Sequence, residues 1–296
     1  MHEGCSEIFT AFVRSAGRQK GQYSKLVIDF HTHIFPDKMA PETIRFLEDK
    51  ADIKAYGNGK RSGLLASMED GDIAVSVVLP VVTKPRQFAT INRCAAETTR
   101  EFEGLKRRLI SFGGIHPDTK DYRGELEQIR DLGLPGVKVH PEYQQVDIDD
   151  VRYIRIIQYA RELGLYVTVH AGFDPGFPDG KHCTPGQIRN VLDEVSGDHL
   201  ILAHLGGVHE WDDVEKLLIG RDVWFDTSAV CMSDISDEQY TRMIRSHGSG
   251  RILYATDWPW DDQKATVKRL CSLNLTAEEK DSILWRNGAA ILGMKP

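Results

Sequence analysis

Residues 25–33 of the 296-residue sequence read KLVIDFHTH, an apolar run that ends in a pair of histidines. The run predicts a buried β-strand, because it is short and carries β-branched Val and Ile. In a strand, side chains two residues apart point to the same side, so His31 and His33 can reach one ion. The sequence therefore places a candidate metal-binding pair at the end of its first strand.

The same kind of run recurs along the chain, separated by segments with helical periodicity. Residues 151–163, VRYIRIIQYAREL, show the helical pattern, and Gly164 follows as a stop. Strict β-then-α alternation predicts a parallel sheet with right-handed crossovers, and eight units favour an α/β fold of the (β/α)₈ TIM barrel type. The expected strands are residues 25–30, 73–79, 109–115, 136–140, 165–170, 200–204, 223–227 and 252–256.

The length fits one domain, because such a barrel needs about 250 residues. We expect residues 25–296 to form a single catalytic barrel and residues 1–24 to be an N-terminal extension. Residues 34–61 are longer than an ordinary βα connection, which leaves two readings open: a lid or substrate wall, and a surface insertion without a role.

Composition excludes several classes of function. The 37 basic and 44 acidic residues give a net charge of −7, and no basic cluster is present, so nucleic acid is not an expected partner. No run approaches the roughly 18 apolar residues of a membrane span. The five cysteines are scattered and form no C-x-x-C pair, which fits a reducing cytoplasm. We therefore expect a soluble, cytoplasmic protein with a small-molecule substrate.

Six of the eleven histidines stand at or just after the end of an expected strand, and Asp257 ends the eighth strand. In a barrel these strand ends converge on the face that carries the chemistry. Imidazole and carboxylate together suit zinc, manganese or iron. Taken singly, each residue has an ordinary alternative, as a core histidine or a helix cap; together they favour a metal site. The six histidines are His31, His33, His116, His140, His170 and His204.

The motifs DFHTH, VTVHAG, LAHLGG and ATDWPW together resemble the amidohydrolase superfamily. They are most similar to the amidohydrolase-related branch that includes aminocarboxymuconate-semialdehyde decarboxylase, and the resemblance extends to WRNGA at residues 285–289. It implies one divalent metal, with zinc expected first and manganese or iron as alternatives. His204 matches a base or electrophile in one-metal members and a second-metal ligand in two-metal members. The ligands implied for the first ion are His31, His33, His170 and Asp257.

Lys138 leaves the number of ions open. It resembles the lysine that is carboxylated to bridge two metals in dihydroorotase-like members, yet many one-metal relatives keep a lysine there. Lys138 and His140 are two residues apart and share one side of their strand. We expect one tight ion, keep a second, weaker ion open, and expect Lys138, His140 and Trp258 to contact substrate.

Hydrolysis is the first reaction that the resemblance implies. A metal lowers the pKa of bound water from 15.7 to about 7, and the resulting nucleophile would attack an amide, ester or lactone. Asp257 would accept the proton of the water and later pass it to the leaving group, while His204 stabilises negative charge.

Non-oxidative decarboxylation on the same site is the alternative, and the sequence does not separate the two reactions. It requires a cation for the leaving carboxylate, for which Arg61, Lys84, Arg86 and Lys138 are candidates. A non-catalytic binding barrel is disfavoured by the intact ligand set. A TatD-like nuclease is disfavoured by the missing strand-four glutamate. Related barrels are often homodimers, although no motif here demands one.

Overall fold

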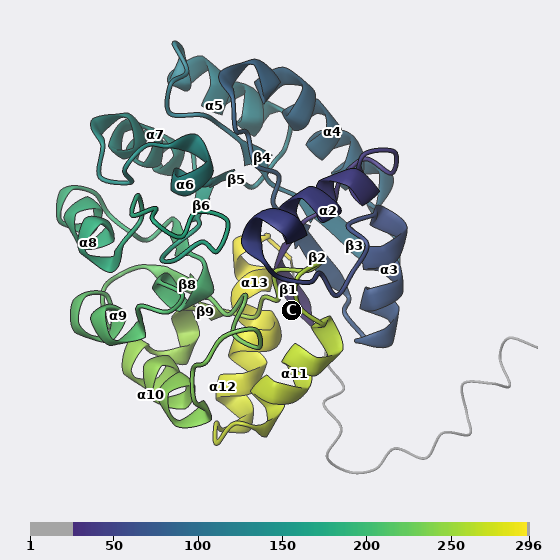
Figure 1. The fold of residues 1–296 in the computed structure, drawn as a ribbon, viewed down its shortest axis with the longest axis vertical. Coiled ribbons are helices and arrows are strands. Elements are labelled where there is room, and N and C mark those ends of the chain that lie inside the picture. The colour runs from purple at the N-terminus through teal and green to yellow at the C-terminus, as the bar shows by residue number, and fades with distance from the viewer. Residues whose placement is uncertain (1–25, 295–296) are drawn as a thin grey trace, which may run out of the picture.

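The computed structural model describes residues 26–294 and shows an eight-stranded parallel barrel inside a ring of helices (Figure 1). The predicted fold is confirmed, and each expected strand has its counterpart; the proposed extension at residues 1–24 lies outside the described residues. The third barrel strand is divided in two by Phe112. The strands are β1 (Ile28–Thr32), β2 (Val75–Val78), β3 (Arg108–Ser111) with β4 (Gly113–Gly114), β5 (Gly136–Val139), β6 (Tyr166–Val169), β7 (Leu200–Leu202), β8 (Trp224–Asp226) and β9 (Ile252–Leu253).

Backbone hydrogen bonds between the last and first strands close the sheet. The strand order is β1-β2-β3 and then β4 through β9, and Phe112 N donates to Val78 O at 2.9 Å between these two sets. At the seam, Phe30 N donates to Tyr254 O at 2.8 Å and Asp257 N donates to His31 O at 2.9 Å. The first and eighth barrel strands are therefore neighbours, which brings Asp257 beside the histidine pair.

Helices follow the strands around the barrel in chain order (Figure 1). The start of α8 shows how the sequence sets a boundary: the Thr184 hydroxyl accepts a hydrogen bond from Gln187 N, and Pro185 occupies the first turn. The helices are α2 (Ala40–Ala51), α3 (Arg61–Asp70), α4 (Phe88–Glu101), α5 (Tyr122–Asp131), α6 (Pro141–Gln144), α7 (Val151–Glu162), α8 (Pro185–Glu194), α9 (Trp211–Leu217), α10 (Asp237–His247), α11 (Gln263–Ser272), α12 (Ala277–Asp281) and α13 (Asn287–Ile291).

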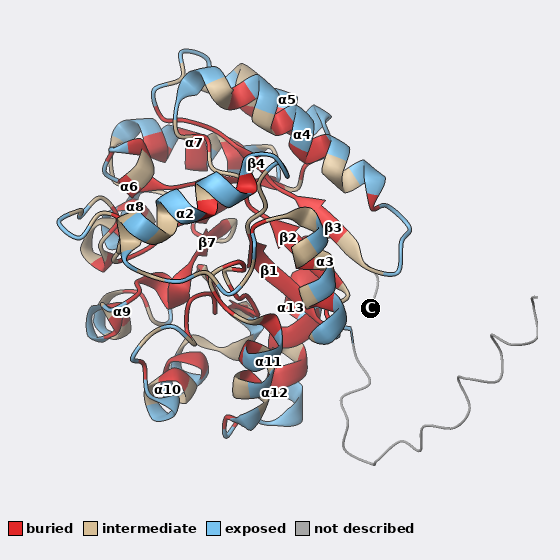
Figure 2. Cartoon of the chain, turned by 45° about the vertical axis from the view of Figure 1, so that its right-hand side comes forward, coloured by how far each residue is buried: buried red, intermediate tan, exposed pale blue. Residues whose placement is uncertain are grey.

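The apolar core has two parts, and the strands contribute to both. Figure 2 shows that the strands are largely buried. The larger part holds most of the helix residues, including those of α7 and α10, and packs them on the strands. The smaller part contains strand residues such as Phe30 and Val77 together with Trp285 and Ala289 from the C-terminal segment. Gly288 permits this approach, because an added Cβ would lie 3.3 Å from Ile28 and Phe30. The C-terminal segment thus completes the core beneath β1.

The long segment after β1 contains helix α2, and its residues line the central cavity. Gly57 N donates to Pro259 O at 2.9 Å, and a Cβ on Gly57 would lie 2.5 Å from the Trp258 ring. The segment therefore packs closely on the turn after Asp257 and forms a wall of the cavity. Within residues 26–294, no helix is long and apolar enough to cross a membrane.

Candidate metal centre and pocket

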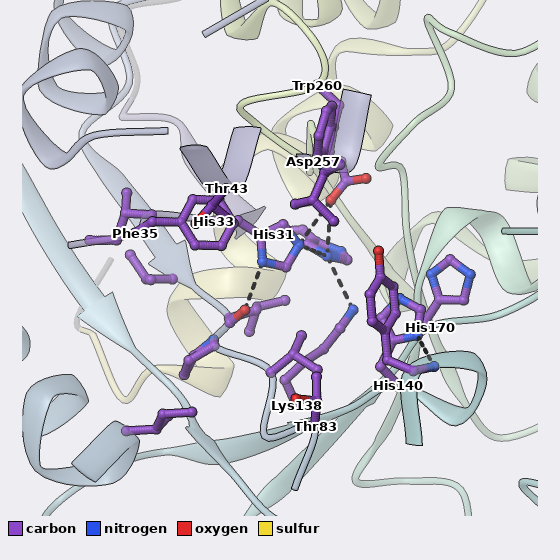
Figure 3. A pocket seen from close by; sticks show the side chains of 18 of the residues that line it. His31, His33, Phe35, Thr43, Thr83, Lys138, His140, His170, Asp257 and Trp260 are labelled. Carbon is purple, nitrogen blue, oxygen red and sulfur yellow. Dashed lines mark hydrogen bonds and ion pairs between the residues drawn. The ribbon is translucent and has the colours of Figure 1, made fainter. Parts of the chain in front are cut away.

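A cavity of about 1410 Å³ opens where the carboxyl ends of the strands meet (Figure 3). Charged and imidazole side chains from the ends of β1 and β5 and from the loops after β6, β7 and β9 converge at its base, as the barrel rule predicts. Aromatic side chains form much of the surrounding surface. The polar group includes His31, His33, Lys138, His140, His170, Asp174, His204 and Asp257, and the aromatic group includes Phe35, Phe46, Tyr143, Phe173 and Trp260.

His31, His33 and Asp257 form the first cluster. The two Nε2 atoms lie 3.2 Å apart, and Asp257 Oδ1 lies 3.3 Å from His31 Nε2 and 3.1 Å from His33 Nε2. Ligand atoms about 2.0–2.2 Å from one ion lie roughly 3.0–3.6 Å from one another. The first cluster therefore has the spacing of three ligands of a single ion.

Hydrogen bonds on the far side of each ring orient the first cluster. His31 Nδ1 lies 2.8 Å from Asp226 Oδ2, and His33 Nδ1 lies 2.7 Å from Leu79 O. Both partners accept, so each Nδ1 carries the proton and each Nε2 keeps a lone pair. Such outer partners fix the tautomer and orientation of metal-binding histidines. The donor set thus fits a divalent metal in chemistry as well as in spacing.

The backbone at this site is strained. Asp257 has a φ of 69° and His204 a φ of 58°, both in the left-handed region that non-glycine residues rarely adopt. Such conformations cost about 1–3 kcal/mol each and persist where surrounding contacts hold them. Here Asp257 N donates to His31 O, and His204 N donates to Asp226 Oδ1 at 3.0 Å. The left-handed backbone and these hydrogen bonds together direct the side chains of Asp257 and His204 into the cavity.

Groups of opposite charge face each other at the base of the cavity. Burial lowers the pKa of His31 to about 4, which leaves its ring neutral near pH 7. Burial alone would raise the pKa of Asp257, but His31 and His33 hold it well below its ordinary value, so the carboxylate is ionised. Burial lowers the pKa of Lys138 to about 8, while the carboxylates of Asp226 and Asp257 oppose that shift. A carboxylate and an ammonium therefore face the same space.

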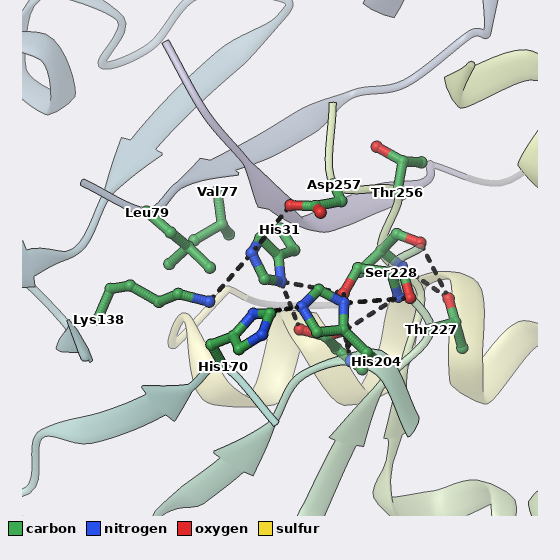
Figure 4. A network of polar contacts seen from close by, with 12 residues as sticks. His31, Val77, Leu79, Lys138, His170, His204, Thr227, Ser228, Thr256 and Asp257 are labelled. Carbon is green, nitrogen blue, oxygen red and sulfur yellow. Dashed lines mark hydrogen bonds and ion pairs between the residues drawn. The ribbon is translucent and has the colours of Figure 1, made fainter. Parts of the chain in front are cut away.

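Lys138 is 1% exposed, and its Nζ lies 3.1 Å from His31 Nε2. The lysine is thus in direct contact with the first cluster (Figure 4). Other cations considered from sequence are less well placed. Arg61 and Arg86 also line the cavity, but Arg61 forms an ion pair with Glu101 and Arg86 is exposed. Lys84 is absent from the cavity lining.

Asp226 and Ser228 connect the first cluster to His204. Figure 4 shows Ser228 beside His204. Ser228 Oγ donates to Asp226 Oδ1 and lies 2.9 Å from His204 Nδ1. Because the serine hydroxyl donates its proton to Asp226, its oxygen must accept from His204, and the donor is therefore Nδ1–H of His204. The Nε2 of His204 then accepts from His170 Nδ1, 3.0 Å away.

His140, His170 and Asp174 form the second cluster. Their ligand atoms lie within 4.8 Å of one another, and all three residues are buried. The two rings are stacked with centroids 4.0 Å apart, and Asp174 Oδ2 lies 3.4 Å from His140 Nε2 and 3.9 Å from His170 Nε2. Burial lowers the pKa of both imidazoles well below the ordinary value, so both are neutral.

The structure brings most of the predicted site residues together, in a grouping that differs from the expected one. His31, His33 and Asp257 converge, whereas His170, the expected fourth ligand, lies with His140 and Asp174. Its assignment to the first ion stays a prediction.

Trp258 is placed differently from the expected substrate contact. It is 1% exposed and is absent from the cavity lining, whereas Trp260 lines the cavity. The indole of Trp258 packs against Gly57, where the missing side chain leaves room for it.

Sequence reasoning missed Asp174, Asp226 and Ser228. Asp226 ends β8, so the strand-end rule that selected Asp257 applies equally to it. Asp174 lies in the loop after β6, where no strand or helix pattern marks it.

Comparisons with known proteins agree with this fold. The family model described as amidohydrolase matches residues 28–294. A comparison with curated protein sequences gave no significant match.

Solved structures with this fold include decarboxylases. One is 5-carboxyvanillate decarboxylase from Novosphingobium aromaticivorans, complexed with manganese and 4-hydroxy-3-methoxy-5-nitrobenzoic acid. The two structures align with a TM-score of 0.68 at 14% sequence identity, and the alignment covers 92% of this chain and 97% of the decarboxylase chain. A second is 2,6-dihydroxybenzoate decarboxylase from Rhizobium, with a TM-score of 0.65, 15% identity and coverage of 91% and 99%.

A candidate 2-pyrone-4,6-dicarboxylic acid hydrolase from Pseudomonas putida has a TM-score of 0.62, 17% identity and coverage of 92% and 98%. At these identities the structural likeness shows a shared fold. The family match spans almost the whole described chain. This chain is therefore an enzyme of the amidohydrolase family.

Proposed function

We propose that this enzyme is a metal-dependent, non-oxidative decarboxylase of aromatic carboxylic acids. The observation that carries the proposal is the buried ammonium of Lys138, in contact with the first cluster at the base of the cavity. A buried ammonium is costly, and the carboxylates of Asp226 and Asp257 offset only part of that cost, because the pKa of Lys138 stays lowered. A substrate carboxylate would offset more of it. The decarboxylases that share this fold act on aromatic acids, as their names state.

The cavity wall supports an aromatic substrate. Phe35, Tyr143, Phe173 and Trp260 line the space above the polar base. Aromatic walls favour a flat ring, while a few polar groups fix its orientation. A ring held between these walls would direct its carboxylate toward Lys138.

His31, His33 and Asp257 would hold the metal ion, which would supply positive charge to bind the substrate and to stabilise negative charge in the transition state. Three protein ligands with further positions open are typical of a catalytic site. Zinc suits this donor set, and manganese is supported by the ion in one solved decarboxylase. We propose one such ion at the first cluster.

We assign separate roles in decarboxylation to individual residues of the chain. Lys138 Nζ binds and orients the carboxylate. The C–C bond breaks, CO₂ leaves, and the remaining carbon keeps the electron pair and takes a proton. Asp257 lies at the base of the cavity, and its lowered pKa means that its carboxyl gives up a proton readily, so we assign to it the transfer of the proton from solvent to carbon.

Hydrolysis is the second candidate, because the ionised Asp257 carboxylate is equally placed to accept a proton from water. In that reaction Lys138 would bind a carboxylate elsewhere on the substrate. A candidate hydrolase of a pyrone dicarboxylic acid also shares the fold.

A substrate panel tests the proposal. Enzyme loaded with manganese or zinc is incubated with hydroxylated benzoic acids and with lactones and esters of aromatic acids, and both CO₂ and new carboxylic acid are measured. We expect CO₂ from at least one benzoic acid, and none from the His33→Ala variant. Release of acid from lactones or esters, with no CO₂ from any benzoic acid, would show that the enzyme is a hydrolase and not a decarboxylase.

A further inference from the structure

Asp29 is a buried carboxylate that joins the two chain segments of the first cluster. It is 0% exposed and is absent from the cavity lining, so it does not contact substrate. Its Oδ1 accepts hydrogen bonds from His31 N at 3.2 Å and from Thr256 N at 3.0 Å. Its Oδ2 accepts from the Thr256 hydroxyl at 2.6 Å and from Gln263 Nε2 at 2.7 Å. Asp29 therefore ties the backbone of one histidine of the first cluster to the residue that precedes Asp257.

Thr256 extends this support to both sides of Asp257, and Figure 4 shows the two residues next to each other. The Thr256 hydroxyl donates to Asp29 and accepts from Trp258 N at 3.1 Å. The residues before and after Asp257 are thus held by one hydroxyl group. Asp257 itself has a φ of 69°, a conformation that persists only where surrounding contacts hold it.

Gln263 anchors Asp29 to the start of helix α11 and to the neighbouring strand. Its Nε2 donates to Asp29 Oδ2 and to Ser76 Oγ at 3.1 Å, and its backbone oxygen accepts from the Tyr254 hydroxyl at 2.7 Å. Gln263 and Ser76 are both 0% exposed. In the protein interior such hydrogen bonds are strong, and breaking one leaves a buried polar group without a partner. The position of Asp29 is therefore fixed from behind.

We propose that Asp29 is a positioning residue of the metal centre, which acts through Thr256 to hold the Asp257 carboxylate at the two histidines. Within the described chain, the Asp257 carboxylate pairs only with the imidazoles of His31 and His33. Its direction therefore depends on the backbone at residues 256–258, which Asp29 and Thr256 hold. A misplacement of about 1 Å can cost about 100-fold in function. The proposal rests on the metal centre and not on decarboxylation, because hydrolysis would use the same carboxylate.

The test is the zinc affinity of the full chain, measured by competition with a chromophoric chelator. Thr256→Val keeps the shape of the side chain and removes the hydroxyl that binds Asp29 and Trp258 N. Asp29→Asn leaves a single oxygen for the donors around it. We expect each change to weaken zinc binding by about 10–100-fold. The double variant should be no weaker than the weaker single variant, since both changes break one pathway. Thr256→Ser keeps the hydroxyl and should restore an affinity within about threefold of the wild type.

Thr227→Val is the matched control. The Thr227 hydroxyl is equally buried, donates to Ala255 O at 3.1 Å and accepts from Ala255 N at 2.9 Å, but it does not bind a neighbour of Asp257. This variant should lose stability in urea unfolding and keep its zinc affinity. Equal weakening in Thr227→Val and Thr256→Val would overturn the proposal, because the loss of any buried hydroxyl would then suffice. Unchanged affinity in Thr256→Val or in Asp29→Asn would also overturn it, as would a wild type that binds no zinc.

Discussion

The first and second clusters contain the same types of residue but are supported differently. In the first, both imidazoles are held from behind by short hydrogen bonds, to Asp226 Oδ2 at 2.8 Å and to Leu79 O at 2.7 Å. In the second, His140 is held by a 3.4 Å bond and His170 by another imidazole. Rigid outer support lowers the cost of gathering ligands around an ion. We therefore expect the first cluster to be the one that binds the metal ion.

The largest effect should come from Asp257→Asn. The change keeps the size of the side chain and removes the charge that we assign to proton transfer, so kcat should fall by about 10²–10⁴-fold. Steady-state kinetics on metal-loaded protein measure it, with the exposed Asp147→Asn as control. A kcat within threefold of the wild-type value would show that Asp257 does not take part in proton transfer.

Asp226→Asn tests the outer support of the first cluster. Loss of the carboxylate behind His31 should weaken binding of the ion at the first cluster by about 10–100-fold. Competition with a chromophoric chelator measures the affinity for the ion. An unchanged affinity would mean that Asp226 does not support the first cluster.

The smallest effect concerns the stability of metal-free protein. One pKa unit corresponds to about 1.36 kcal/mol, and burial lowers the pKa of Lys138 from 10.5 to about 8. Lys138→Met removes a buried charge but also a hydrogen bond to His31, so we expect a gain of about 1–2 kcal/mol in the free energy of unfolding at pH 7.

The pH dependence of that gain gives the check. Between pH 8 and 10.5 the unfolded chain holds the Lys138 proton more often than the folded chain, so the wild type gains stability as pH rises. The advantage of Lys138→Met should therefore shrink over this window in urea unfolding. An advantage that stays constant would contradict the lowered pKa.

The barrel and the first cluster could be predicted because both follow from short-range patterns. Apolar runs mark strands, and strand ends identify His31, His33 and Asp257 as neighbours once the barrel closes. Asp226 obeys the same rule, but an aspartate after a strand is also an ordinary helix cap, so sequence alone does not single it out.

The second cluster could not be predicted in the same way. Asp174 reaches His140 through a loop in which Gly172 has a φ of 83° and Gly176 N binds the carboxylate. The direction of His170 depends on a ring–ring hydrogen bond with His204. These are tertiary contacts, and neither leaves a periodic trace in the sequence.

The most direct test of decarboxylation is the fate of solvent hydrogen. Metal-loaded enzyme and a ¹³C-carboxyl-labelled hydroxybenzoic acid that it consumes are incubated in D₂O and followed by NMR. The account predicts ¹³CO₂ or its bicarbonate and one deuterium on the carbon that lost the carboxylate, with neither formed by metal-free protein. Consumption of substrate with the ¹³C-carboxylate retained in the product would contradict it.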